Sequence, residues 1–306
     1  MPIAVPQAAL AVQAPVSVSV LMPVYNAADH LEDAVRSILT QTLTDLELVI
    51  VDDGSTDESP AILARLQAED ARIRVLRQPN GGIVSALNLG LSHCTGVCIA
   101  RMDADDIALP ERLARQWAAF EADPSLVLCG TALKQFGDRH GMLRFPSSDA
   151  GCRALLMTWS CFAHPTVMMR RETLLLSGLR YEADYQHAED YQLWSALAER
   201  GRLCNLPEPL LHYRVHERQI SQARKASQEA VHLRVSSANL ARVAVKLSTQ
   251  ELAPVLFARG NGPWRSLVST LVAVGRCRRA PKGVLLPLVR RGLRVTARNA
   301  LVRLTG

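Results

Sequence analysis

Apolar runs alternate four times with segments of helical periodicity between residues 16 and 123. The predicted strands are Val16–Met22, Leu46–Val51, Ile73–Leu76 and Val97–Met102. Apolar residues at helical spacing follow each run, and Asp29 is expected to cap the first helix. Strands that alternate with helices in this way pair in parallel. The sequence therefore predicts an α/β fold with a mostly parallel sheet flanked by helices.

Carboxylates gather where two of these strands end. The sequence from Val51 is V-D-D-G-S-T-D, and the sequence from Arg101 is R-M-D-A-D-D. In an open α/β sheet, ligands bind just beyond the carboxyl ends of the strands. Crowded carboxylates repel one another unless a cation lies between them, and a hard divalent cation also binds phosphate. We therefore expect a metal-assisted site for a nucleotide diphosphate, although an ordinary acidic turn would explain the first cluster alone.

The alternation stops after Asp123. Short apolar pieces follow, and then a predicted helix at Glu189–Glu199 and a predicted strand at Leu210–Val215. A polar amphipathic helix is expected from Ser221 to Lys246. We divide the chain into a disordered leader (1–15), a main domain (16–221) and a helical tail (222–306). Within the main domain, residues 16–123 are expected to bind the nucleotide and residues 124–221 the acceptor.

Six motifs, taken in order, resemble those of family 2 glycosyltransferases, which have the Rossmann-like GT-A fold. They are P-V-Y-N, V-D-D-G-S-T-D, N-G-G before A-L-N-L-G, R-M-D-A-D-D before L-P-E-R-L, E-D-Y-x-L-W and Y-R-V-H-x-x-Q-I-S. The resemblance runs from about Ser17 to Ser221, about two thirds of the chain. It implies an inverting, metal-dependent hexosyl- or hexosaminyltransferase of the kind that builds bacterial surface polysaccharides. The donor would be a nucleotide-diphosphate sugar, UDP-linked by preference, and the acceptor a hydroxyl of a glycan or lipid-linked glycan.

The resemblance assigns the metal and the diphosphate to the D-x-D pair Asp103 and Asp105. Residues i and i+2 of an extended segment face the same side, so both can address one ion. Hard oxygen ligands suit Mg²⁺ or Mn²⁺. We expect Asp105 to be the direct ligand and Asp103 to bind through water or the ribose. Arg101 is expected to contact phosphate or to balance Asp103, and Asp106 is an alternative helix cap.

Further donor contacts follow from the same resemblance. Asp53 matches the carboxylate that accepts the N–H of the nucleotide base, and Pro23 and Tyr25 match the lip of the base pocket. A buried core position is the alternative for Tyr25. Arg214 or His216 is expected to meet the diphosphate and offset the charge of the leaving group.

On the acceptor side, Glu189 and Asp190 resemble the catalytic E-D pair of the family. A sugar hydroxyl must lose its proton as it attacks the anomeric carbon, and a carboxylate within hydrogen-bond reach can take it. We expect Asp190 to be this base and Glu189 to orient it. The positive end of the helix dipole is expected to lower the pKa of Asp190. An acid that only stabilises its helix is the alternative, and His164 is expected to line the acceptor pocket.

Other classes of enzyme are disfavoured. No G-x-G-x-x-G follows the first strand and the chain has no P-loop lysine, which argues against a dehydrogenase and an ATPase. A nucleotidyltransferase and a non-catalytic nucleotide-sugar-binding scaffold remain as alternatives. The former usually has a glycine-rich basic loop after the first strand, which P-V-Y-N does not provide. The seven cysteines include no C-x-x-C pair and lie mostly in apolar runs, so we expect buried reduced thiols.

The positive charge is concentrated near the C-terminus. Residues 253–306 contain eleven Arg and Lys and no Asp or Glu; because the net charge is +6, the rest of the chain carries −5. From residue 289 the apolar residues form one helical stripe: Val289, Leu293, Ala297, Ala300, Leu301 and Leu304. A basic amphipathic helix of this kind lies in the headgroup plane of an anionic membrane. A helix packed on the enzyme with solvated arginines is the alternative.

These features predict where the protein lies in the cell. The first fifteen residues lack the basic start of a signal peptide, and no run of eighteen uncharged apolar residues occurs. We therefore expect a cytoplasmic enzyme held at the inner face of the cell membrane through residues 284–306. Nucleic acid is not an expected partner, because Phe257 and Trp264 are the only aromatic residues of the tail.

Overall fold

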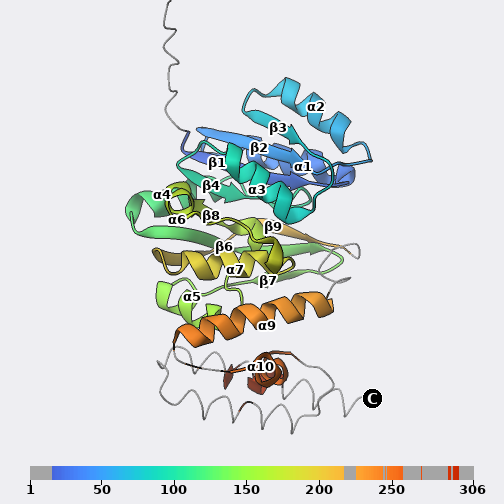
Figure 1. Ribbon diagram of the computed structural model, residues 1–306. Helices are drawn as coiled ribbons and strands as arrows, with labels where there is room; N and C mark the ends of the chain where they lie inside the picture. Colours follow the sequence, from blue (N-terminus) through green and yellow to red (C-terminus); the bar gives the residue numbers. More distant parts are fainter. Residues whose placement is uncertain are drawn as a thin grey trace, which may run out of the picture.

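The computed structural model describes residues 16–216, 225–243, 245, 247–257, 270, 289, 290 and 292–295. The disordered leader predicted at residues 1–15 lies outside these residues, as does most of the predicted tail. Figure 1 shows the sheet and the helices that cover it.

The predicted alternation in the first half is confirmed. The parallel strands β1 (Val18–Val24), β2 (Leu46–Asp52), β3 (Ile73–Arg77) and β4 (Cys98–Arg101) lie in the order β3-β2-β1-β4. They alternate with the helices α1 (Ala28–Leu39), α2 (Ser59–Glu69) and α3 (Ile83–His93). The cap expected of Asp29 is wrong. Ala27 is the N-cap residue and gives no side-chain cap, and Asp57 of the neighbouring loop accepts the backbone N–H of Ala28 instead.

The second half extends the same sheet with strands of both directions. The order continues from β4 to β8 (Met168–Arg170), β6 (Leu126–Gly137), β9 (Arg202–Val215) and β5 (Ile107–Ala108), and β7 (Gly141–Leu143) pairs with β6. Strand β8 runs antiparallel to β4 and β6, whereas β6 and β9 are parallel. The sheet is therefore mixed, with its parallel part at the nucleotide end. The predicted apolar pieces Leu126–Cys129 and Leu133–Phe136 belong to one strand, β6, because pairing with β9 continues through both.

Helices cover both faces of the sheet. Helices α1, α2 and α4 (Arg112–Ala122) pack on one face through residues such as Leu31 and Leu113. Helices α3, α5 (Asp149–Leu156) and α7 (Glu189–Leu197) pack on the other, around the fully buried Trp194. The short helix α6 (Arg171–Ser177) follows β8. Two apolar cores therefore hold the sheet between two helical layers, and the strand ends remain available for a site.

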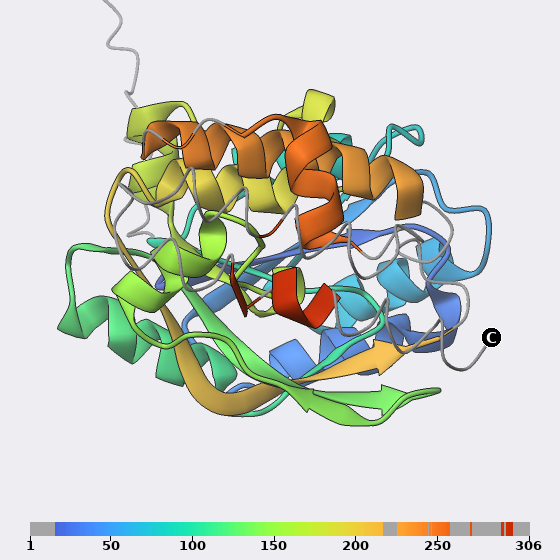
Figure 2. The same ribbon diagram turned by 90° about the horizontal axis from the view of Figure 1, so that it is seen from below.

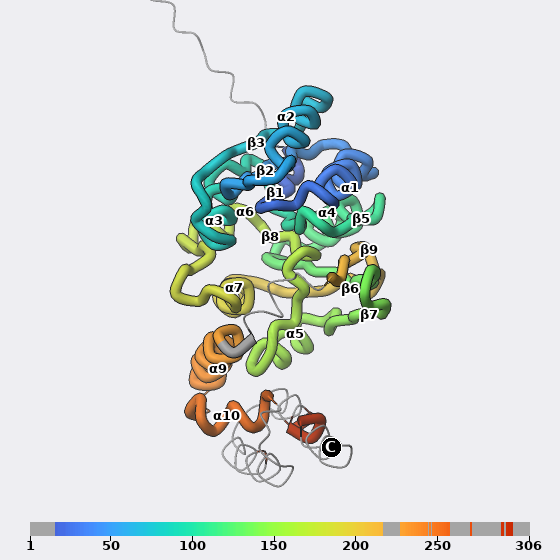
Figure 3. The backbone as a smooth tube through the Cα atoms, turned by 90° about the vertical axis from the view of Figure 1, so that its right-hand side faces the viewer, coloured from blue at the N-terminus to red at the C-terminus, as the bar shows by residue number. Residues whose placement is uncertain are grey.

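Helices α9 (Lys225–Arg242) and α10 (Thr249–Leu256) form a further layer. Figures 1 and 3 place α9 beyond α7 and α10 beyond α9, and Figure 2 shows α9 running along α7. Asn239 of α9 donates to the Leu156 carbonyl and to the Ser195 hydroxyl, both at 2.8 Å. The helix predicted across Ser221–Lys246 is thus present. Its buried polar side chains bond to the domain beneath it.

Six cysteines are free thiols, and five of them are buried, as predicted. Cys277 lies outside the described residues. Over the part of the chain that the structure describes, no helix has the length and apolar character needed to cross a bilayer.

Candidate functional site

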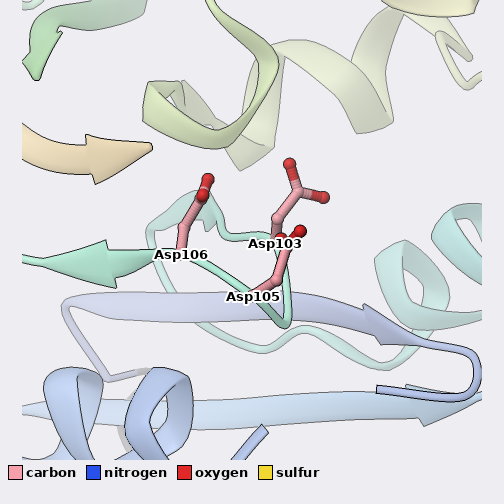
Figure 4. A group of neighbouring side chains, drawn as sticks. All are labelled: Asp103, Asp105 and Asp106. Atoms are coloured by element: carbon pink, nitrogen blue, oxygen red, sulfur yellow. The ribbon is translucent and has the colours of Figure 1, made fainter. Parts of the chain in front are cut away.

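Three carboxylates converge in the segment that follows β4. Their ligand atoms, one each from Asp103, Asp105 and Asp106, lie within 4.8 Å of one another. Figure 4 shows the three side chains rising from one loop to the same side. The loop forms where β4 ends at Arg101 and before β5 begins at Ile107. The D-x-D pair predicted from the sequence is therefore joined by the next aspartate.

The electrostatics of this triad fit a hard cation. Burial raises the pKa of Asp106 well above its ordinary value, and the charges of Asp103 and Asp105 raise it further. Oδ2 of Asp106 is buried and has no hydrogen-bond partner among the described residues. A divalent cation would satisfy this oxygen and remove the mutual repulsion, because its charge is the largest in such a site. The alternative of Asp106 as a helix cap is wrong, since Glu111 is the N-cap residue of α4.

The end of β9 closes over the triad. The backbone N–H of Arg214 donates to Asp106 Oδ1 at 2.8 Å, and Nε of Arg214 donates to the Asp105 carbonyl at 2.9 Å. Nε2 of His216 lies 3.0 Å from Oδ2 of Asp105. The two residues predicted to meet the diphosphate therefore lie against the D-x-D loop. His30, which sequence reasoning missed, has its ring centroid 6.4 Å from that of His216.

Arg101 lies beneath the loop at the end of β4. Its side chain is buried, and Nη1 is 2.5 Å from Oδ2 of Asp103. Its positive charge also lowers the pKa of Asp190, although other effects on Asp190 are larger. Of the two predicted roles, the balance of Asp103 is the one seen in the structure. Arg101 thus connects the triad with the acceptor side electrostatically.

Asp53, the predicted partner of the base, is buried at the end of β2. Its carboxylate accepts the backbone N–H groups of Gly81 at 2.8 Å and Gly82 at 2.9 Å, and the Gln78 amide at 2.6 Å. A carboxylate accepts about four hydrogen bonds, so one position on Oδ2 remains for a ligand. Gly54 has a φ of +76°, and a Cβ there would lie 2.8 Å from the Asn80 nitrogen, so the close approach of the two loops requires glycine.

Pro23 and Tyr25 flank this region at the end of β1. Pro23 is buried within β1, because the pairing with β2 continues through Val24. Tyr25 follows the strand and its side chain is 52% exposed, so the alternative of a core position for it is wrong. An exposed ring at the carboxyl end of a strand remains available to a ligand.

Asp190 lies in the first turn of α7, next to Glu189. Burial and the charge of Glu189 raise the pKa of Asp190 to about 7. The predicted lowering of this pKa is therefore wrong. Desolvation of the partly buried carboxylate and the adjacent like charge outweigh the helix terminus and Arg101. Glu189 accepts the N–H of His187 through Oε2 at 2.6 Å, which fixes the start of the helix.

His164 packs beneath the acceptor side. Its Nε2 is 3.0 Å from the Tyr181 hydroxyl, and its ring meets Trp194 edge-on with centroids 5.8 Å apart. Burial, with a smaller effect of Arg101, lowers the pKa of His164 well below its ordinary value, so it is neutral at pH 7. The described contacts of His164 are thus with aromatic side chains.

A cavity of about 710 Å³ opens beside this cluster. It lies between α3 and the segment that precedes α7, and residues such as Asn88, Arg180, Tyr181 and Gln186 line it. Asn88 ties its two walls together: Nδ2 donates to the Tyr181 carbonyl at 2.8 Å, and Oδ1 accepts the Tyr181 N–H at 3.0 Å. His164 is not among the lining residues. Tyr181 lies outside the motif residues used for prediction, so no signal in the sequence pointed to it.

Comparison with known proteins gives this geometry a context. A family model described as Glycosyl transferase family 2 matches residues 19–175. The amylovoran biosynthesis glycosyltransferase AmsE of Erwinia amylovora is 35% identical over 216 residues, which cover 67% of this chain and 79% of the relative.

Two solved structures share the fold. S. aureus TarS 1-349 in complex with UDP-GlcNAc has a TM-score of 0.63 at 18% identity and covers 92% of this chain and 89% of that one. The mannosyltransferase PcManGT from Pyrobaculum calidifontis, in complex with GDP-Man and Mn²⁺, has a TM-score of 0.61 at 19% identity. That match covers 94% of this chain and 88% of the other.

Proposed function

This chain belongs to glycosyltransferase family 2 and has the GT-A fold, and from that premise we propose that it is an inverting, metal-dependent hexosyl- or hexosaminyltransferase. The donor is a nucleotide-diphosphate sugar, UDP-linked by preference. The acceptor is a hydroxyl of a glycan or lipid-linked glycan. The relative AmsE acts in amylovoran biosynthesis by name, which supports a role in bacterial surface-polysaccharide assembly.

One observation carries the proposal. The aspartate triad and Asp190 come from distant parts of the chain, yet the buried Arg101 pairs with Asp103 and its charge also lowers the pKa of Asp190. A metal-binding cluster beside a carboxylate with a raised pKa is what transfer of a sugar from a diphosphate requires.

The donor side is assigned to the residues around β1, β2 and β4. Asp53 and Tyr25 hold the base, and Asp103, Asp105, Arg214 and His216 address the diphosphate. Mg²⁺ or Mn²⁺, when bound to Asp105 and Asp103, would neutralise the charge of the departing diphosphate. The similar structures hold UDP-GlcNAc in one case and GDP-Man with Mn²⁺ in the other, which supports this class of donor.

The acceptor side is assigned to the cavity that Tyr181 and Gln186 line. Asp190 follows these residues in the chain, at the start of α7. It is the base that removes the proton of the acceptor hydroxyl as the oxygen attacks the anomeric carbon. A single displacement by this oxygen inverts the configuration at that carbon. His164 supports Tyr181 from below and thereby the wall of the cavity.

A screen of nucleotide sugars tests the function. The matching donor at 100 times its Kd should stabilise the folded protein by about 2.7 kcal/mol, seen as a rise in Tm. The rise should depend on Mn²⁺ or Mg²⁺ and should be absent with the nucleoside monophosphate, which lacks the diphosphate. Incubation with acceptor should then release the nucleoside diphosphate. Release of pyrophosphate would instead indicate a nucleotidyltransferase, and binding without transfer or donor hydrolysis would indicate a scaffold.

We further propose that residues 284–306 hold the enzyme at the inner face of the cell membrane. Of this segment the structure describes Val289, Arg290 and residues 292–295. Gly292 and Val295 are buried, whereas Arg290, Leu293 and Arg294 are exposed. An exposed leucine between arginines supports a face that meets anionic lipid headgroups. The rest of the predicted stripe lies outside the described residues.

Replacement of Arg290, Arg291, Arg294 and Arg298 with Gln should release the protein from anionic vesicles. Each basic residue near such a surface contributes about 1 kcal/mol, so four replacements should lower the partition coefficient by about three orders of magnitude. Vesicle co-sedimentation measures this, and added salt should weaken the binding of the wild type.

The control for total charge replaces four exposed arginines outside the tail: Arg36, Arg65, Arg115 and Arg202. This variant should bind vesicles as the wild type does. Equal binding of the wild type to neutral and anionic vesicles would contradict the electrostatic attachment. Binding to neither would leave the alternative of a helix packed on the domain.

A further inference from the structure

Arg112, the first residue of α4, is a fully buried arginine close to the aspartate triad. Burial of a charge costs several kcal/mol unless partners compensate. Among the described residues, no carboxylate lies within ion-pair distance of Arg112. Burial lowers the pKa of Arg112 only to about 10, so the guanidinium remains charged at neutral pH. A buried and unpaired cation at this place needs a reason beyond packing.

Two of the contacts of Arg112 are with the residues that lead into the triad. Nη2 donates to the Arg101 carbonyl at 2.6 Å, and Nη1 lies 3.2 Å from the sulfur of Met102. Nε donates to Oε1 of Gln116 at 3.2 Å. All three groups of the guanidinium are therefore used, and two of them hold the two residues immediately before Asp103.

The frame behind Arg112 is rigid. The amide of Gln116 donates to the Cys129 carbonyl at 2.8 Å and to the Thr166 carbonyl at 2.9 Å. These carbonyls belong to β6 and to the turn before β8. Through Arg112 and Gln116, the loop that carries the triad is thus held in place relative to the sheet.

The triad needs such a support before any cation binds. Its three carboxylates converge within 4.8 Å and repel one another. Arg101 pairs with Asp103 directly, but Asp106 has no ion-pair partner among the described residues. Arg112 is a fixed positive charge close enough to Asp106 for the two to interact electrostatically.

We propose that Arg112 is a positioning residue of the metal site: it holds the Arg101 carbonyl and the Met102 side chain and offsets the repulsion within the triad, so that the loop is formed before the cation arrives. This inference rests on the proposed function, because it requires that the triad binds a metal. Arg112 is the arginine of the L-P-E-R-L segment that follows the D-x-D motif. The proposal thus assigns that segment the support of the metal-binding loop.

The affinity of the full-length protein for Mn²⁺ alone, measured by calorimetry without nucleotide, tests the proposal. Loss of a group that supports metal ligands costs about 10- to 100-fold in metal affinity, and we expect this loss for Arg112→Met. Arg112→Lys keeps a charge but not the planar set of donors, so it should also lose affinity, by about 10-fold.

Two controls separate this role from plain stability. Asn239→Leu removes the buried hydrogen bonds from α9 to the Leu156 carbonyl and the Ser195 hydroxyl. It should lower Tm comparably, yet retain wild-type Mn²⁺ affinity. Arg115→Met removes a surface charge from α4, the helix of Arg112, and should change neither quantity.

Each result decides a different claim. If Arg112→Met binds Mn²⁺ as tightly as the wild type, or if Asn239→Leu loses as much affinity, the positioning role is overturned. If Arg112→Met does not fold, wild-type affinity in Arg112→Lys overturns it. If the wild type itself does not bind Mn²⁺, the metal part of the proposed function is overturned instead.

Discussion

Asp190→Asn is expected to lower turnover by about 10²- to 10⁴-fold, the range that removal of a general base produces. Asn preserves the size of the side chain and its place at the start of α7 but cannot accept a proton from the acceptor hydroxyl. The affinity for the nucleotide sugar should change little, because Asp190 is assigned to the acceptor side. Steady-state kinetics at saturating donor and acceptor, with donor affinity from calorimetry, measure the two quantities separately.

The pH dependence gives this prediction a second signature. Burial and Glu189 raise the pKa of Asp190 to about 7. A base acts only when it is unprotonated, so turnover of the wild type should rise with pH up to about 7 and level off above it. Below pH 7 it should fall about tenfold per unit, because the unprotonated fraction does so. The turnover of the Asn variant should not show this rise with pH.

Asp29→Asn is the matched control. Asp29 is the second residue of α1, as Asp190 is the second residue of α7, but it is exposed. An acid that only stabilised its helix would make the two variants alike, with losses of stability and little change in turnover. Near-normal turnover of Asp190→Asn at saturating acceptor would show that Asp190 is not the base.

The nucleotide half could be predicted from the sequence because its signals are local. Each strand of the parallel part is a short apolar run, and each is followed by a helix with its own periodicity. The acidic clusters lie at strand ends, where parallel topology brings them to one edge of the sheet. Local pattern and global topology agree there, and the D-x-D loop lies at the end of β4, where the sequence predicts it.

The second half could not be predicted in the same detail. Strand β9 begins at Arg202, eight residues before the predicted start at Leu210, and its first part pairs with β6. Pairing between distant segments leaves little trace in a local pattern. The cavity wall at Tyr181 is likewise formed with a distant residue, Asn88, 93 positions away in the sequence.

The ionisation of Asp190 shows a further limit. Its place at a helix start is visible in the sequence, and the helix dipole alone would lower its pKa. Burial depends on the surrounding packing, which the sequence does not display. The balance of the two effects needed the structure, and it reversed the expected direction.

Asp105→Ala is expected to abolish the metal-dependent part of donor binding, and turnover with it. Asp105 contributes one of the three clustered carboxylates and contacts His216 through Oδ2. Its removal takes a negative charge and a ligand oxygen from the site, so the affinity for donor in the presence of Mn²⁺ should fall by about 100-fold or more. Calorimetric titration of the nucleotide sugar, with Mn²⁺ and with a chelator, measures the metal-dependent part directly.

Glu121→Ala controls for the loss of one negative charge, since Glu121 is exposed near the end of α4 and away from the triad. It should bind donor as the wild type does in both conditions.

Asp105→Asn refines the result, because it keeps the size of the side chain and removes only the charge. If Asp105→Asn loses as much affinity as Asp105→Ala, the negative charge of the carboxylate accounts for the loss, and not the size of the side chain. An amide is a weaker ligand for a hard cation. Equal affinity of the wild type for donor with Mn²⁺ and with chelator would contradict a metal at this site. The triad would then have only a structural role in its loop.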